Sequence, residues 1–136
     1  MARVAAALLG AGFSFERMAL LAPFRRQVRE IRNAVLRATS GEQLPIIDTV
    51  ERLQGQSVDV AMVSLASSDP DHLTSIADFY FSDNRWNVAL SRAKTKVVLF
   101  GSPLVLHALP RSLNAALAVT RLGKVLRAAH VLAPPV

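Results

Sequence analysis

The sequence predicts an α/β fold in which helices cover both faces of a parallel sheet. The short continuous apolar run at 18–22 and the mainly apolar run at 58–66 are typical of strands that are buried on both faces. Segments with a helical spacing of apolar residues alternate with these runs, as happens when each strand returns through a helix to a parallel neighbour. A chain of 136 residues that is 51% apolar and 19% charged is also suited to burying one core.

The first half of the chain is expected to contain two helices and three strands. Phe24, Val28 and Ile31 begin a series of apolar residues at steps of three and four, which predicts a helix. Gly10 and Gly12 are expected to end the first helix of the chain. The expected elements are a helix over 2–9, a strand over 18–22, a helix over 24–38, and strands over 44–50 and 58–66.

The second half is expected to be mainly helical, with one further strand. Asp69 and Pro70 have the character of a helix start, because Asp accepts hydrogen bonds from the first backbone N–H groups and Pro suits a first turn. Gly101 is expected to end the last strand. The expected elements are helices over 71–81 and 84–94, a strand over 97–100, a short helix over 103–109 and a long helix over 112–132.

Charge is arranged in three blocks along the chain. Residues 1–40 carry seven Arg and two Glu, residues 41–83 carry one Arg and eight acids, and residues 84–136 carry eight Lys or Arg and no acid. If the fold brings the basic flanks together, their surface would attract phosphate backbones. The charges alone are equally consistent with ordinary solvated side chains.

Composition excludes several classes of protein. With no cysteine, the chain has no disulfide, thiolate metal site or cysteine nucleophile, and this agrees with a reducing compartment. No apolar run is long enough to cross a membrane, and residues 4–11 suit an opening amphipathic helix better than a signal peptide. We therefore expect an intracellular, cytoplasmic protein with no metal site and no membrane partner.

Parallel sheets bind ligands beyond the carboxyl ends of their strands. The segments after the expected strands are 23–27, 49–56, 64–69 and 101–102. In the first of them a helix start, with free backbone N–H groups, stands beside Arg25, Arg26 and Gln27, which suits an anion. Proline in a first turn and arginines on a surface helix are also routine, so this segment alone decides nothing.

The segment 48–59 places polar residues between two apolar strands. Thr49 and Gln54 can donate hydrogen bonds to phosphates, and Gly55 lets the backbone approach a ligand closely. A polar loop with one glycine is common, so by itself the segment is equally consistent with an ordinary connection.

The segment 84–94 is expected to be a basic helix that carries Arg85, Arg92 and Lys94. Arginine suits a transferring phosphoryl group because its planar fork makes two hydrogen bonds to oxygens. An arginine supplied by a neighbouring domain is a common activator of nucleotide hydrolysis. A basic amphipathic helix beside a sheet is the simpler interpretation of the same residues.

Together, and in this order, the three segments resemble the C-terminal RecA-like domain of superfamily 1 helicases in the Upf1/Dna2-like branch. Pro23 to Gln27 resembles the Pro-aromatic-x-x-Gln segment of that branch, and 48–64 resembles motif V. Asn87 to Lys94 is similar to motif VI. The resemblance implies a single three-layer RecA-like domain of the P-loop NTPase type over 1–136, with a core of about 15–105 and a C-terminal helical extension over 106–136.

The resemblance implies a role for each matching position. Arg92 matches the catalytic motif VI arginine, which reaches the γ-phosphate of ATP across the cleft between two RecA-like domains. Gly55, Gln56 and Ser57 match the turn that faces the nucleotide. The implied contacts with single-stranded DNA or RNA are made by Arg26, Gln27, Thr49, Gln54 and Lys94.

Three departures from the family pattern limit these roles. Ser57 stands where the family usually has a glutamate that helps to bind the nucleotide. The Gln-Tyr-Arg-Met element and the Gly-x-x-x-x-Gly-Lys-Ser/Thr P-loop do not occur in these 136 residues. Because a P-loop cradles the phosphates and places Mg²⁺, we expect ATP and Mg²⁺ to be bound mainly by a P-loop-bearing domain in cis or in trans. The polypeptide is not expected to hydrolyse ATP alone.

Two alternatives stay open from the sequence. One is a truncated helicase remnant that binds nucleic acid or a partner domain without turnover. The other is a small-molecule α/β enzyme that uses His72, His107 or His130, of which only His72 has acids beside it. The helicase interpretation expects Arg92 to be accessible at the carboxyl edge of the sheet, opposite a domain that this chain does not contain.

Overall fold

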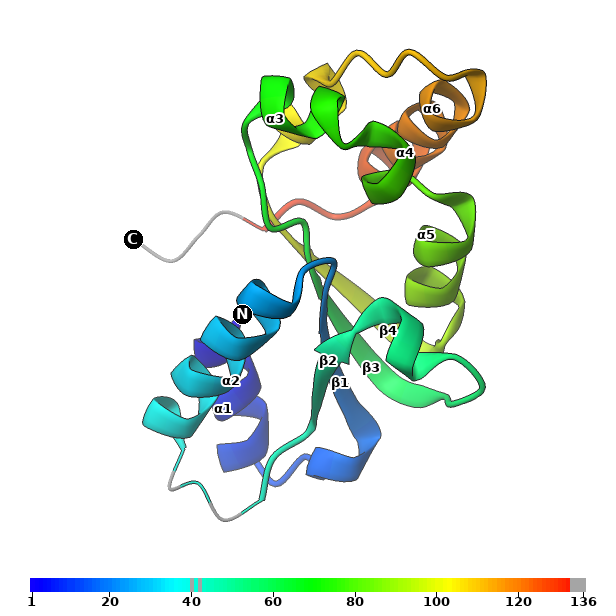
Figure 1. The fold of residues 1–136 in the computed structure, drawn as a ribbon. Helices are drawn as coiled ribbons and strands as arrows, with labels where there is room; N and C mark the ends of the chain where they lie inside the picture. The colour runs from blue at the N-terminus through cyan, green and yellow to red at the C-terminus, as the bar shows by residue number, and fades with distance from the viewer. Residues whose placement is uncertain (40, 42, 133–136) are drawn as a thin grey trace.

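The computed structural model describes residues 1–39, 41 and 43–132, and it is built on a four-stranded sheet of order β2-β1-β3-β4 (Figure 1). All three pairs of neighbouring strands are parallel. The predicted α/β fold with a parallel sheet is therefore confirmed. The strands are β1 (Met18–Ala22), β2 (Ile46–Thr49), β3 (Val58–Ser64) and β4 (Ala93–Phe100).

Helices lie on both sides of this sheet, with α1 and α2 grouped on one side and α3 to α6 on the other (Figure 1). The α-helices are α1 (Ala2–Gly10), α2 (Arg25–Ala38), α3 (Pro70–Ser75), α4 (Ala77–Tyr80), α5 (Asp83–Ser91) and α6 (Leu113–Ala128). The short 3₁₀ helices in the described part of the chain are η1 (Phe15–Arg17), η2 (Val50–Leu53) and η3 (Pro103–His107).

The central strand β1 separates two apolar layers, because successive side chains of a strand point to opposite faces. Ala19 and Leu21 pack into a cluster with buried residues of α3 to α6. Met18, Leu20 and Ala22 pack into a second cluster with buried residues of α1 and α2. The continuous apolar run that predicted this strand is explained by helices on both faces.

The helix predicted over 84–94 is wrong at its carboxyl end. α5 stops before Arg92, and Ala93 already pairs with Val58 as the first residue of β4. Lys94 therefore lies on a strand, not on a basic helix. The local sequence suits a helix, but the backbone N–H of Val58 donates to the carbonyl of Arg92 at 3.0 Å and draws this part of the chain into the sheet.

The helix predicted over 71–81 is divided into α3 and α4 at Ile76, whose φ and ψ are −115° and 19°. The hydroxyls of Thr74 and Ser75 donate to backbone carbonyls of α3, at 2.8 and 2.6 Å. Such bonds compete with the helical ladder and bend it. Two other predicted helices are altered in kind or length: 103–109 is the 3₁₀ helix η3, and 112–132 is helical only to Ala128.

The proposed division into a core of about 15–105 and an extension over 106–136 stays a prediction. α6 contributes buried Ala115, Ala118 and Leu122 to the same apolar cluster as β1 and β3. Residues 133–136 of the predicted extension lie outside the described residues.

Candidate functional site

The carboxyl edge of the sheet collects one group of the predicted site residues. Thr49 ends β2 and is in register with Ala22, the last residue of β1. Gln27 lies in the first turn of α2, and its Nε2 donates to the buried Oγ of Ser64 at the end of β3, at 3.5 Å. Arg26, the residue before Gln27, is exposed. A hollow of about 260 Å³ lies at this edge and includes Gln27 and Ser64 in its lining.

The segment after Thr49 leaves this edge. Val50 and Leu53 bury the 3₁₀ helix η2 in the core, and the chain then returns to Val58 at the start of β3. Gly55 has a φ of +82°, a conformation that glycine adopts without strain. The residues between η2 and β3 are all exposed, namely Gln54, Gly55, Gln56 and Ser57.

Arg92 lies at the amino edge of the sheet, where its carbonyl accepts a hydrogen bond from Val58. The expectation that Arg92 would lie at the carboxyl edge is therefore wrong, because a residue directly before a parallel strand lies at the amino end of that strand. Its side chain is partly exposed and is not sealed in the core. Its Nε is buried and has no hydrogen-bond partner among the described residues.

The predicted residues thus form two groups at opposite edges. The cluster at the carboxyl edge of the sheet, called here the carboxyl-edge cluster, contains Arg26, Gln27 and Thr49. The amino-edge cluster contains Gln54, Gly55, Gln56, Ser57, Arg92 and Lys94, with Lys94 exposed near the start of β4. The length of the strands separates the two clusters, so one ligand contacts both only if it extends across the domain.

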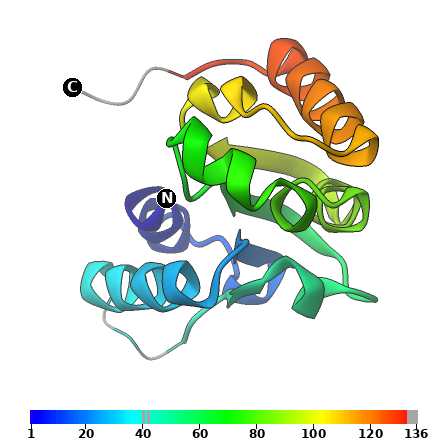
Figure 2. The same ribbon diagram turned by 45° about the horizontal axis from the view of Figure 1, so that its top comes forward.

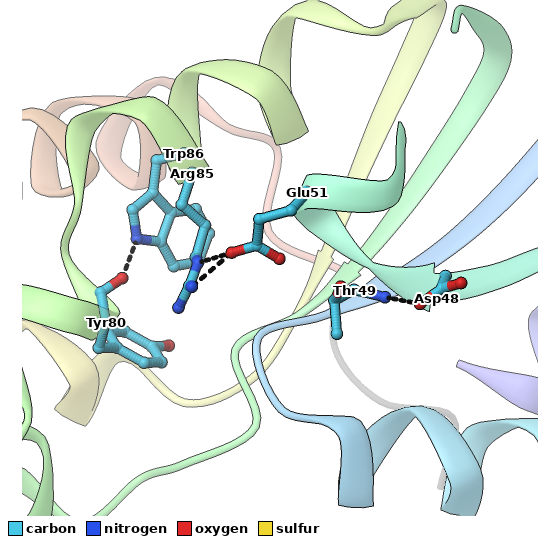
Figure 3. Close-up of polar contacts among 6 residues, drawn as sticks. All are labelled: Asp48, Thr49, Glu51, Tyr80, Arg85 and Trp86. Carbon is cyan, nitrogen blue, oxygen red and sulfur yellow. Dashed lines mark hydrogen bonds and ion pairs between the residues drawn. The ribbon is translucent and has the colours of Figure 1, made fainter. Parts of the chain in front are cut away.

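Sequence reasoning missed an ion pair between the segments 48–59 and 84–94. Arg85 on α5 points toward Glu51 on η2, and its Nε donates to the carboxylate of Glu51 at 2.7 Å (Figure 3). The side chain of Arg85 is only 9% exposed. Its guanidinium also lies over the ring of Phe79, 3.8 Å from the ring centroid. The sequence held only a weak signal for this pair, namely opposite charges in two of the segments that were singled out.

The pair also sets the ionisation of Glu51. Burial alone would raise the pKa of Glu51, but hydrogen bonds from its own backbone and from Arg85 outweigh burial and hold the pKa below its ordinary value of 4.5. Glu51 is therefore charged at neutral pH and attracts the guanidinium. The carboxylate is half exposed, so solvent weakens this attraction.

The amino-edge cluster suits the phosphates of a nucleotide better than it suits a magnesium ion. Arg92 offers a guanidinium whose Nε has no partner among the described residues, and Gly55 leaves open space where a side chain would otherwise stand. No group of three or more His, Cys, Asp or Glu is placed to hold a metal within 1–39, 41 and 43–132. His72, His107 and His130 are all exposed, and His72 lines a hollow of about 1140 Å³ together with Asp71.

Comparison with known proteins follows the same direction. Residues 1–104 match the model of a family described as an AAA domain. The chain is 34% identical over 99 residues to the putative helicase mov-10-B.1 of Danio rerio. The matched region covers 65% of this chain and 10% of that protein. It is 30% identical over 104 residues to the probable RNA helicase armi of Drosophila melanogaster, covering 74% and 9%. It is 33% identical over 100 residues to the DNA replication ATP-dependent helicase/nuclease DNA2 of Mus musculus, covering 74% and 9%.

The fold and these matches define an α/β domain of the RecA-like type. The chain belongs to the AAA domain family, in the Upf1/Dna2-like branch of superfamily 1 helicases. It spans about a tenth of the length of the curated relatives that it matches. None of the helices in the described part of the chain has the length and apolar character needed to cross a bilayer.

Proposed function

We propose that this chain is the second RecA-like domain of an ATP-dependent helicase and supplies Arg92 to ATP held by a P-loop-bearing domain. The observation that carries the proposal is the partly exposed amino-edge cluster, in which Arg92 lies directly after α5 and beside the start of β3. Its guanidinium would stabilise negative charge that develops on the γ-phosphate during transfer. Gly55, Gln56 and Ser57 would face the same nucleotide.

The carboxyl-edge cluster would bind the phosphates of single-stranded DNA or RNA. Arg26, Gln27 and Thr49 lie at the ends of neighbouring parallel strands or in the helix turn that follows. These side chains donate to phosphate oxygens without reading bases. Gln54 and Lys94, which were expected to share this role, lie in the amino-edge cluster. They would contact the nucleic-acid strand only where it passes the partner domain.

The test is an assembled ATPase. This chain is mixed with a separately purified RecA-like domain that carries a P-loop, and ATP hydrolysis is measured with and without an oligonucleotide. We expect Arg92→Ala to lower kcat about a thousandfold or more, because an arginine that stabilises the transferring group contributes that much. Lys96→Ala, which removes an exposed cation of β4 that has no proposed contact with either ligand, is the matched control and should leave most of the turnover.

Two results of this assay would count against the proposal. Turnover that survives Arg92→Ala would remove the assigned role from this arginine. A wild-type chain that binds the partner or the oligonucleotide but never stimulates hydrolysis would favour the second candidate, a helicase remnant that binds without turnover. The absence of a P-loop sequence from these 136 residues is the observation that favours this candidate.

A further inference from the structure

Arg85 in the first turn of α5 and Arg92, the residue directly after α5, face the same segment of chain. Arg85 binds Glu51 through its side chain, and Arg92 binds Val58 through its carbonyl. Seven residues of α-helix rise about 10 Å and return to nearly the same face. α5 therefore runs alongside the segment 51–58, with one attachment at each end of it.

Stability alone gives a poor reason for the buried end of this contact. The Arg85 side chain is 9% exposed, and its Nη1 is buried without a partner among the described residues. Taking a guanidinium out of water is costly, and apolar residues of similar volume often serve stability as well or better. A buried ion pair of this kind is better explained by the geometry that it imposes on the segment.

Arg85 also reaches toward the opposite edge of the sheet. Its guanidinium lies on the ring of Phe79, and that ring stacks on Phe24 with 6.0 Å between centroids and 22° between planes. Phe24 is the residue directly before α2, whose first turn carries Arg26 and Gln27. A continuous series of contacts thus joins Glu51 to the start of α2.

We propose that Arg85 is a positioning residue that holds the segment 50–57 against α5. Gly55 to Ser57 and Arg92 then contact a ligand as one rigid surface. Phe79 connects this surface to the carboxyl-edge cluster. The role in turnover rests on the proposed function, whereas the clamp itself does not.

The clamp is tested on the chain alone by hydrogen–deuterium exchange of the backbone amides in 50–57. Arg85→Met keeps the apolar stem and removes the charge, Arg85→Lys keeps the charge without the fork, and Glu51→Gln alters only the half-exposed partner. We expect exchange to accelerate about tenfold in Arg85→Met and Glu51→Gln and by less in Arg85→Lys, because local opening becomes easier. Arg52→Met, on the same 3₁₀ helix but exposed, is the control and should match the wild type.

Protected amides in β1 and β3 report whether each variant is folded. Should Arg85→Met fail to fold, the milder Glu51→Gln decides the question. The double variant should exchange no faster than the faster single variant, because both remove one interaction. Unchanged exchange in folded Glu51→Gln and Arg85→Lys overturns the clamp.

The second measurement separates positioning from folding. In the assembled ATPase, Glu51→Gln and Arg85→Lys should lower kcat about tenfold while KM for ATP stays within about twofold, because the displaced segment misaligns Arg92 without removing it. Unchanged kcat in variants with a loosened segment overturns the positioning role. If wild type gives no hydrolysis but the exchange result is as expected, the proposed function fails and the clamp stands.

Discussion

Tyr80 shows how one side chain fixes the layer that carries α5. It is fully buried, its hydroxyl donates to the carbonyl of Leu65 at 2.5 Å, and its own carbonyl accepts from the indole N–H of Trp86 at 2.9 Å (Figure 3). The rings of Phe81 and Trp86 meet it edge to face. These contacts connect the end of β3 to α5, which carries Arg85 and is followed directly by Arg92.

Burial raises the pKa of Tyr80 far above its ordinary value of 10, although the nearby charge of Arg85 partly opposes the shift. In the unfolded chain this phenol ionises near pH 10, whereas in the folded chain it keeps its proton. The stabilising contribution is therefore fully present below pH 10 and declines as the pH rises above 10. We expect the urea midpoint of the wild type to fall over this range.

The measurement is simple because Tyr80 is the only tyrosine of the chain. Tyrosinate absorbance should appear together with unfolding and not before it. Tyr80→Phe is the control: it should lose about 1 kcal/mol at neutral pH with the hydroxyl bond, and much of the decline above pH 10. Tyrosinate that forms while the chain is still folded would contradict this account.

At the scale of elements, the ends of β3 and β4 are held together at Gly101. A Cβ built on Gly101 would lie 2.5 Å from the Cβ of Leu65, the residue that follows β3. The backbone N–H of Leu65 donates to the carbonyl of Phe100 at 2.8 Å, so the ends of these two strands have little room to separate. Gly101 and Ser64 both line the hollow at the carboxyl edge, so this close approach also shapes the proposed strand-binding edge.

Gly101→Ala should therefore destabilise the domain by about 1–3 kcal/mol or more, since the added methyl group forces side chain and backbone apart. Urea unfolding followed by tryptophan fluorescence measures the change. Gly10→Ala is the matched control, because no atom lies within 4 Å of a Cβ at Gly10, in the last position of α1. That variant should be neutral or slightly stabilising, and equal losses in both variants would show that contact with Leu65 is not the cause.

At the scale of the whole molecule, the two basic blocks of the sequence meet at one hollow of about 1140 Å³, which Arg26 and Arg111 both line, but their main helices lie apart. α2, which belongs to the first block, and α6, which belongs to the second, lie at opposite sides of the domain (Figure 2). The net charge of +6 still favours polyanions in general. Of these two helices α2 is the one that begins at the carboxyl edge, and the proposed strand contacts should therefore depend on α2 and not on α6.

We expect the chain to bind a single-stranded oligonucleotide with a Kd that rises with salt concentration, as counterion release requires. Arg26→Ala should reduce the slope of log Kd against log salt concentration by about one phosphate contact. Lys124→Ala, an exposed cation on α6, is the control and should leave the slope unchanged. Fluorescence anisotropy at several salt concentrations measures the slopes, and equal slopes for both variants would argue against the carboxyl edge as the strand-binding site.

The sequence by itself determined the fold class and the central elements. The apolar run at 18–22 is β1, and the helical spacing from Phe24 onward is α2 with Phe24 just before its first turn. Local pattern sufficed there because burial on both faces, or on one helical stripe, leaves a direct trace in residue order. The motif resemblance likewise led to the family that comparison then showed.

Only the tertiary structure decided how the site residues are grouped. Residue order does not reveal that Val58 pairs with the chain at Arg92 and Ala93, which turns the end of a predicted helix into β4. That pairing moved Arg92 to the amino edge and left Arg26, Gln27 and Thr49 at the other. The contact between Arg85 and Glu51 joins residues 34 positions apart. Such contacts depend on packing between elements, and local sequence carries little information about them.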